Sequence, residues 1–475
     1  MQLVKSIILK KIKTLHCLLL VFALLFPAVF LVLAAQDNSP NSRYGIGDLA
    51  PSTNINTRAM GGISAGYIDY RTINFANPAS YSFFEANPEA RSRKLANGRA
   101  VLDIGINLES RTLRETNPAR KFTAGNLLFS YVQVSVPVKK NWGISFGLRP
   151  VSRVSYKIFS AERLKDPLTG LPIDSVTTLY DGDGGSSLAT AGTGFKIFKK
   201  TSSNKLEESL SVGFNAGYYF GKRNSSSRRE FRNDTVQYFS GNFETKTNYN
   251  NIYLAGGLLY VKPLKKENMF FSAGVYGSLK QTLNATQDRI RETFVYDLTL
   301  GDLRLDSVSD IKDIKGKVVM PASITAGFLV QQYPDYAKRK GGWLVGIDFA
   351  YQNWEKYRVY GQADSLRNKW EVRIGAQVNP VPGQNYFKNV EYRWGFFFGP
   401  DYVNIRQKLP QFGVSMGLGL PLKYVRNAPN QTTVINLAFE YIKRGNNDNL
   451  LKENLFRLSA GFSLSDIWFI KRKYD

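Results

Sequence analysis

The sequence predicts an all-β protein, a transmembrane antiparallel β-barrel of about fourteen strands with an N-terminal plug, or hatch, inside its lumen. Three observations predict this fold. The chain starts with a segment typical of secretory signals, later segments of ten or more residues alternate apolar and polar side chains, and aromatic residues make up 13% of the chain. Sandwich strands usually have about five or six residues, whereas barrel strands need roughly nine to eleven to cross a bilayer. Strand length therefore favours the barrel over a soluble sandwich.

Residues 1–35 are expected to be a signal peptide. Four lysines precede the apolar run LHCLLLVFALLFPAVFLVLAA, and the polar stretch QDNSPNSRYG follows it. A basic start, an apolar centre and a small-residue end are the parts of a secretory signal. A retained membrane anchor is the alternative, and Pro27 inside the apolar run disfavours it. Export together with a barrel fold predicts a location in the cell outer membrane.

The single His and the single Cys of the chain, His16 and Cys17, fall within this expected signal peptide. The mature chain would therefore have no disulfide, no Cys or His metal ligand and no nucleophile activated by His. No acidic pair or Ser-x-x-Lys motif stands out as a catalytic site. We expect no enzyme activity, no catalytic residue, no metal and no cofactor.

Residues 99–475 are expected to form the barrel. In the stretch WLVGIDFAYQ, Trp343, Val345 and Ile347 share one face while Gly346 and Asp348 share the other. Successive strand side chains point to opposite faces, so such a strand has one apolar face and one polar or small face. The fourteen candidate strand cores lie at 99–111, 124–137, 142–157, 187–199, 208–222, 243–262, 269–283, 317–331, 342–355, 367–379, 390–399, 408–422, 432–443 and 454–469.

The connections between these strands are of two kinds. The connections 159–186 and 284–316 are long and are expected to be cell-surface loops, and the second holds seven acidic against five basic residues. The alternate connections are mostly short and basic, as at Lys139-Lys140 and 338–340. These basic turns would either contact anionic headgroups or an acidic periplasmic partner, or be solvated turn residues. The basic residues form no continuous stripe, so no nucleic-acid partner is expected.

Residues 36–98 are expected to hold the hatch. Wall side chains cannot fill the lumen of a fourteen-stranded barrel, so a separate segment is needed to block it. Gly61 and Gly62 permit tight bends, and Asn77-Pro78-Ala79 predicts a fixed turn. Four aromatic residues are expected to make hydrophobic contacts that hold this turn against the inner wall: Phe75, Tyr81, Phe83 and Phe84.

The stretch RAMGG at 58–62, followed by Asn77-Pro78-Ala79, resembles the N-terminal hatch of the FadL/TodX-type outer-membrane transporters of long-chain fatty acids and other hydrophobic compounds. The resemblance implies passive transport of a fatty-acid-like small molecule through a lumen pocket, past a mobile hatch and out sideways into outer-membrane lipid. Pro150, inside the third strand, cannot donate a ladder hydrogen bond. It marks a candidate kink at this lateral opening, with a harmless bulge as the alternative.

Two functions stay open at this point. One is the transporter just described. The other is a non-transporting barrel that serves as a subunit or binding partner of an outer-membrane secretion or assembly complex. A continuous apolar pocket beside the plug would indicate a transporter, whereas a lumen packed solid would indicate a complex subunit. An outer-membrane enzyme fits less well because it would lack His, and an open porin fits less well because of the plug.

Overall fold

The computed structural model describes residues 38–89, 95–116, 119–201, 207–232, 239–264, 268–297, 301–335, 337–381, 383–405, 407–422 and 431–468. The expected signal peptide, residues 1–35, lies outside the described residues. None of the helices within the described ranges has the length and apolar character needed to cross a membrane.

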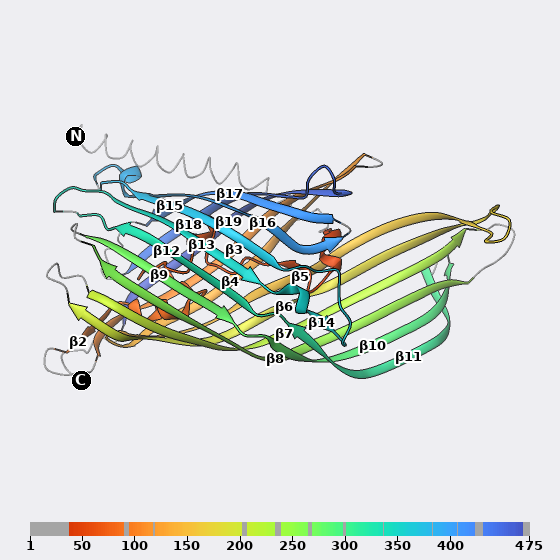
Figure 1. Cartoon of the computed structure of the whole chain (residues 1–475), viewed down its shortest axis with the longest axis horizontal. Helices are drawn as coiled ribbons and strands as arrows, with labels where there is room; N and C mark the ends of the chain where they lie inside the picture. Colours follow the sequence, from red (N-terminus) through yellow and green to blue (C-terminus); the bar gives the residue numbers. More distant parts are fainter. Residues whose placement is uncertain are drawn as a thin grey trace, which may run out of the picture.

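The described chain forms a closed antiparallel barrel of fourteen wall strands (Figure 1). Twelve of them are single elements, and two are each divided into two elements, β9 with β10 and β11 with β12. The last strand, β19, pairs with β3 from Leu451↔Glu115 to Trp468↔Gly98 and closes the barrel. The bounds are β3 Leu95–Glu115, β4 Arg120–Lys139, β5 Trp142–Lys165, β6 Pro172–Thr201, β7 Glu207–Arg232, β8 Ser240–Pro263, β9 Met269–Ser278, β10 Gln281–Asp297, β11 Gly301–Met320, β12 Ser323–Gln332, β13 Gly342–Gln352, β15 Lys369–Asn379, β16 Glu391–Ile405, β17 Gln407–Pro421, β18 Thr432–Arg444 and β19 Leu451–Trp468.

The remaining elements are short. They are η1 Pro40–Arg43, β1 Asp48–Leu49, α2 Ile55–Arg58, η2 Pro78–Phe83, β2 Ala86–Pro88, η3 Trp354–Lys356, β14 Arg358–Val359 and η4 Tyr386–Asn389. The fourteen predicted strand cores correspond one to one with the fourteen wall strands, so the predicted fold class and strand number are confirmed.

The wall strands have the predicted alternation of faces. In β13, Val345 and Phe349 point outward and are about half exposed, whereas Leu344 and Asp348 point inward and are 1% and 2% exposed. Apolar side chains on the outside and polar or small ones on the inside are the pattern of a barrel whose outer wall meets lipid. The protein is therefore an outer-membrane β-barrel.

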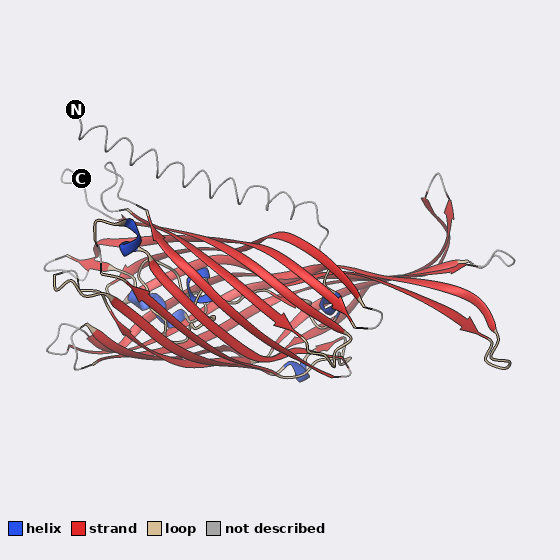
Figure 2. Ribbon diagram, turned by 90° about the horizontal axis from the view of Figure 1, so that it is seen from above, coloured by secondary structure: helices blue, strands red, loops and turns tan. Residues whose placement is uncertain are grey.

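The prediction that 159–186 and 284–316 are loops is wrong, because strands occupy most of both regions, whereas their location at the cell surface stays a prediction. Residues 159–165 and 172–186 continue β5 and β6, and residues 284–297 and 301–316 belong to β10 and β11. Together with the ends of β7 and β8, they form a six-stranded sheet that projects beyond one end of the barrel (Figure 2). The sequence hid these strands because Ser, Thr, Gly and charged residues occupy both faces, so apolar alternation is absent.

Candidate functional site

The candidate site is the barrel lumen, which the N-terminal segment 38–88 enters (Figure 1). Gly61 and Gly62 have φ of +67° and +87°, a conformation that favours glycine. The Gly61 amide donates a hydrogen bond to Ser415 Oγ of β17 at 2.9 Å. A Cβ on Gly61 would lie 2.7 Å from the carbonyl oxygen of Ile374, and a Cβ on Gly395 would lie 1.9 Å from the Gly61 nitrogen. This bend thus packs backbone against backbone on β15 and β16.

Asn77-Pro78-Ala79 forms the start of η2 on the other side of the lumen. The Asn77 side chain accepts a hydrogen bond from the Ala79 amide at 3.1 Å and caps the short helix. Its amide group also donates to Ala65 O at 2.7 Å and to Leu258 O, on β8, at 3.2 Å. A Cβ on Gly213 of β7 would lie 2.2 Å from the Pro78 carbonyl carbon. A wall glycine again makes room for the segment.

The four aromatic residues of the predicted hatch lie around this turn. The ring centroids of Phe75 and of Tyr131, on β4, are 5.0 Å apart, and Tyr81 stacks on Phe84 at 5.9 Å. Phe75, Tyr81 and Phe84 are buried, whereas Phe83 is half-buried. An anchoring role of these aromatic residues and a gating movement of the glycine bend both stay proposals.

Arg58 of α2 ties the segment to three more strands. Its guanidinium donates to Asn107 Oδ1 of β3 at 2.8 Å, to Ser130 Oγ of β4 at 2.6 Å and to Ser459 Oγ of β19 at 3.2 Å. The Arg58 side chain is buried, and this burial lowers its pKa. The hydrogen-bond partners are neutral, and the carboxylates of Glu440 and Glu109 attract the cation from farther away.

A network of ion pairs, which the sequence reasoning missed, clamps the segment near the projecting end. The Asp48 carboxylate lies 2.6 Å from Arg111 and 2.9 Å from Arg444. Glu453 pairs with Arg111 at 2.9 Å, and Asp401 pairs with Arg444 at 2.6 Å. Burial disfavours the charged carboxylate, but the two guanidinium groups outweigh it and hold the pKa of Asp48 well below its usual range.

Further ion pairs lie deeper in the lumen. Arg71 of the segment pairs with Glu391 of β16 at 2.6 Å, and Arg457 of β19 pairs with Glu109 of β3 at 2.6 Å. One signal could have revealed these groups. The polar face of three strands repeats the pattern Glu-x-Arg, which puts an acid and a base side by side on the lumen face, at 109–111, 371–373 and 391–393.

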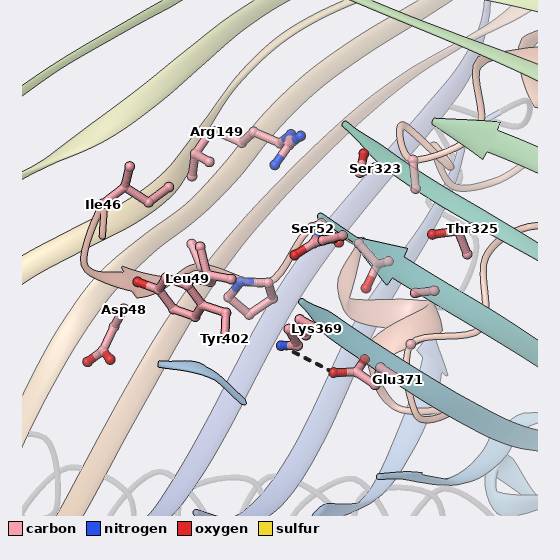
Figure 3. A pocket seen from close by; sticks show the side chains of 18 of the residues that line it. Ile46, Asp48, Leu49, Ser52, Arg149, Ser323, Thr325, Lys369, Glu371 and Tyr402 are labelled. Carbon is pink, nitrogen blue, oxygen red and sulfur yellow. Dashed lines mark ion pairs between the residues drawn. The ribbon is translucent and has the colours of Figure 1, made fainter. Parts of the chain in front are cut away.

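A cavity of about 320 Å³ remains between residues 46–62 and the wall (Figure 3). Apolar side chains such as Leu49 line part of it, together with seven basic and five acidic side chains. Figure 3 shows Arg149 extending toward the cavity and Lys369 paired with Glu371, 3.4 Å away. Ligand pockets for hydrophobic molecules are mostly apolar with few polar groups. This lining is mixed, with charged groups throughout.

Pro150 lies where the wall is interrupted. The ladder between β4 and β5 runs from Lys139↔Trp142 to Val132↔Leu148 and stops one residue before Arg149-Pro150. The register of β5 against β6 shifts between Pro150 and Ser152. Proline has no N–H to give to a ladder, so the bulge has a direct local cause.

The N-terminal segment takes the place of β4 beside β5. β1 pairs with β5 at Asp48↔Arg153 and Leu49↔Ser152, and the Ser39 amide donates to Ser155 O at 2.7 Å. A second cavity of about 110 Å³ lies at this gap, lined by side chains of β4 such as Leu128 and Phe129, by Pro150 and by the segment. The lining thus includes Asn107, which is buried, and Phe129, which is exposed.

Known proteins share this architecture at low sequence identity. A FadL homologue of Pseudomonas aeruginosa is 13% identical with a TM-score of 0.49, and covers 90% of this chain and 100% of its own. The P. putida toluene transporter TodX is 14% identical with a TM-score of 0.47, over 89% of this chain and 99% of its own. The CymD monoaromatic hydrocarbon channel is 13% identical with a TM-score of 0.47, over 88% and 98%. Similarity at this level carries no argument about a ligand.

No curated protein matches the sequence. A family model described as BamG matches residues 11–475, which is nearly the whole chain. The name of this family differs from that of the FadL/TodX type, whose solved structures are among those similar to this chain. This chain belongs to the BamG family.

Proposed function

We propose that this protein is a non-transporting barrel subunit of an outer-membrane protein secretion or assembly complex. The observation that carries the proposal is the fixation of the N-terminal segment around the lumen. Arg58 binds β3, β4 and β19, Asn77 binds β8, Gly61 binds β17, and Asp48 binds β3 and β18. A segment held on so many sides is a structural plug.

Movement of such a plug would be costly. Removing one partner from a buried ion pair costs about 3–5 kcal/mol, because the other charge is left without a partner. Opening the lumen would separate Asp48 from Arg111 and Arg444, and Arg71 from Glu391. A gate that works by thermal population shift has states separated by about a few kcal/mol. The number of fixed contacts favours a permanent plug. The charged lining of the cavity beside the plug disfavours binding of an apolar molecule.

The proposal is tested by tethering the plug. A Cβ on Gly66 would lie 3.2 Å from Ser272 Oγ of β9, so the double variant Gly66→Cys/Ser272→Cys places a disulfide between segment and wall. The matched control, Ser278→Cys/Ser323→Cys, joins two wall strands whose hydroxyl oxygens are 2.9 Å apart. We expect both oxidised variants to co-purify with the same partner proteins as the wild type from mildly solubilised outer membranes, and to support the same growth.

Two results would contradict the proposal. One is recovery of the wild-type barrel as a single polypeptide with no stoichiometric partner. The other is loss of cell growth, or of uptake of a hydrophobic compound, in the oxidised segment tether when the wall tether has no effect.

A second candidate function is passive transport of a fatty-acid-like or other hydrophobic small molecule, and the gap at Pro150 favours it. Leu128, Phe129 and Pro150 line this gap between lumen and outer face. Under this function, Pro150→Val, which restores a ladder N–H, should slow uptake of a labelled fatty acid by whole cells. Under the subunit function, uptake by cells with Pro150→Val equals wild-type uptake.

A further inference from the structure

The six-stranded projecting sheet has two faces of different chemistry. Residues paired directly across a sheet share a face, so one row can be followed strand by strand. The row Ile158–Tyr180–Ser227–Phe243–Arg291–Ser309 crosses β5, β6, β7, β8, β10 and β11. We call the face that carries this row the inner face, because the same face of each strand, followed toward the barrel, becomes the side that faces the lumen, as at Thr247 and Tyr249 of β8.

Three ion pairs lie on the opposite face. Lys222 lies 3.8 Å from Asp183, Lys246 lies 3.2 Å from Glu244, and Arg304 lies 3.2 Å from Glu292. All six side chains alternate with residues of the inner face along their strands. Such mutually neutralised pairs are typical of a solvated surface.

The inner face carries cations without acidic partners. Arg291 pairs directly with Phe243 across the ladder, and Arg229 and Arg289 lie in the two adjacent rows. Arg289 hydrogen-bonds Gln287, and Arg291 donates to backbone carbonyls. Within the described residues, no ion pair joins these three guanidinium groups to a carboxylate, Asp306 on the same face included.

The centre of this arginine group is apolar and exposed. The Phe243 ring is 48% exposed, and the Arg291 guanidinium lies 5.3 Å from its centroid. Arginine and large aromatic residues are the types enriched at the centres of protein interfaces, whereas paired surface charges are typical of exposed rims. Phe243 thus lies against one arginine, Arg291, with two more in the adjacent rows, Arg289 and Arg229, the latter 5.9 Å from the Phe231 ring centroid. This arrangement is suited to a partner that brings carboxylates and an apolar side chain.

The size of the face also fits a protein partner. Six strands spaced about 4.8 Å apart and about seven residues long give a face of roughly 700 Å². This is close to the roughly 800 Å² that each partner contributes to a standard protein interface. In Figure 2 the outer part of the sheet extends beyond the end of the barrel. At its base the N-terminal segment covers one residue of the row, because the Arg43 guanidinium lies 4.5 Å from the centroid of the Tyr180 ring.

We propose that the inner face of the projecting sheet is the docking surface for an acidic segment of a partner polypeptide, centred on Phe243 and bound by Arg229, Arg289 and Arg291. This inference rests on the proposed role as a complex subunit and names the surface and the chemistry of the partner.

The first test measures binding of a defined probe to the full-length barrel in detergent. The probe is a synthetic twelve-residue peptide of alternating Glu and Tyr with a fluorescent label. The inner-face triple variant Arg229→Gln/Arg289→Gln/Arg291→Gln should weaken its binding about ten-fold or more at moderate salt. The opposite-face control Lys222→Gln/Lys246→Gln/Arg304→Gln removes the same charge and should leave binding within about two-fold. Equal weakening of peptide binding by both variants would overturn the proposal. The proposal would also be overturned if the inner-face variant lost binding of lipopolysaccharide but kept binding of the peptide.

The second test locates the contact in cells. A photo-crosslinking amino acid at Phe243 should give a product with an acidic polypeptide, and the product should disappear in the inner-face triple variant. The same probe at Ile290, on the opposite face, should give none. A Phe243 product that contains no protein, or that survives the triple variant, would show the docking surface to be wrong. If the triple variant still forms the same complex as the wild type, the docking surface is wrong but the proposed function stands. If the wild type forms no complex, the proposed function itself is wrong.

Discussion

At the residue scale, paired acidic and basic side chains hold the N-terminal segment inside the lumen. Asp48 contacts one arginine from β3 and one from β18, the two strands that flank β19, and each arginine has a second carboxylate, Glu453 or Asp401. Each cation thus has a partner even where solvent is largely excluded. Because the N-terminal segment supplies the central carboxylate, the network joins that segment to the wall.

Replacing Asp48 by Asn should therefore destabilise the folded protein by about 2–4 kcal/mol, since a buried pair loses one partner while Glu453 and Asp401 compensate in part. The control Asp183→Asn removes a carboxylate from an exposed pair with Lys222 and should change stability by less than about 1 kcal/mol. Denaturant unfolding of the detergent-solubilised barrel measures both. Equal, small effects would contradict the importance of the lumen network.

The pH dependence of the same pair has a definite sign. Because the pKa of Asp48 is lowered in the folded state, its contribution to stability is present above its unfolded pKa and is lost as pH falls through the folded value. We expect the stability difference between wild type and Asp48→Asn to be constant from neutral pH down to about pH 5 and to shrink only in stronger acid. A difference that vanishes near neutral pH would contradict the lowered pKa.

At the element scale, glycines of the wall decide how closely the N-terminal segment can approach. Gly213 of β7, Gly375 of β15 and Gly395 of β16 all have segment backbone where a Cβ would be. These strands carry their large apolar side chains on the outer face. Glycine on the inner face therefore removes no side chain from the apolar outer surface. The segment is accordingly packed against the ladder itself.

Gly395→Ala should displace the bend at Gly61, because its Cβ would lie 1.9 Å from the Gly61 nitrogen. Overpacking of this kind typically costs about 1–3 kcal/mol. Gly256→Ala on β8 is the matched control, since its nearest neighbours outside the adjoining residues are 3.7 Å away. Thermal unfolding followed by gel mobility, with protease cleavage of the N-terminal segment, checks both variants. Unchanged midpoint and cleavage in Gly395→Ala would show that the segment is loosely held.

The number and order of wall strands could be predicted from the sequence because lipid enforces alternation on every strand it touches. The same rule explains the failure at 159–186 and 284–316, where the strands leave the lipid and alternation lapses. Gly61 and Asn77 were identified from turn chemistry, which is local. The partners of Arg58 and Asp48 could not be predicted, since they come from strands 49 to 401 positions away.

At the scale of the whole molecule, the barrel has two ends of different chemistry. One end carries the projecting sheet, and the other carries short turns such as the exposed basic turn that contains Arg339. If the projecting sheet binds a partner, its side of the membrane decides which proteins can reach it. Orientation is therefore the property of the whole molecule on which the proposed docking depends.

We expect the projecting sheet to lie at the cell surface and the basic turns in the periplasm, because long extensions of outer-membrane barrels are extracellular and their periplasmic turns are short. Ser175 on β6 and Arg339 in the turn before β13 are both exposed. Ser175→Cys should react with a membrane-impermeant maleimide in intact cells, whereas Arg339→Cys should react only after the outer membrane is permeabilised. A wall-buried control, Ser459→Cys, should react in neither case, since Ser459 is fully buried. Labelling of Arg339→Cys but not of Ser175→Cys in intact cells would invert the orientation, and the docking surface would then have to serve a periplasmic partner.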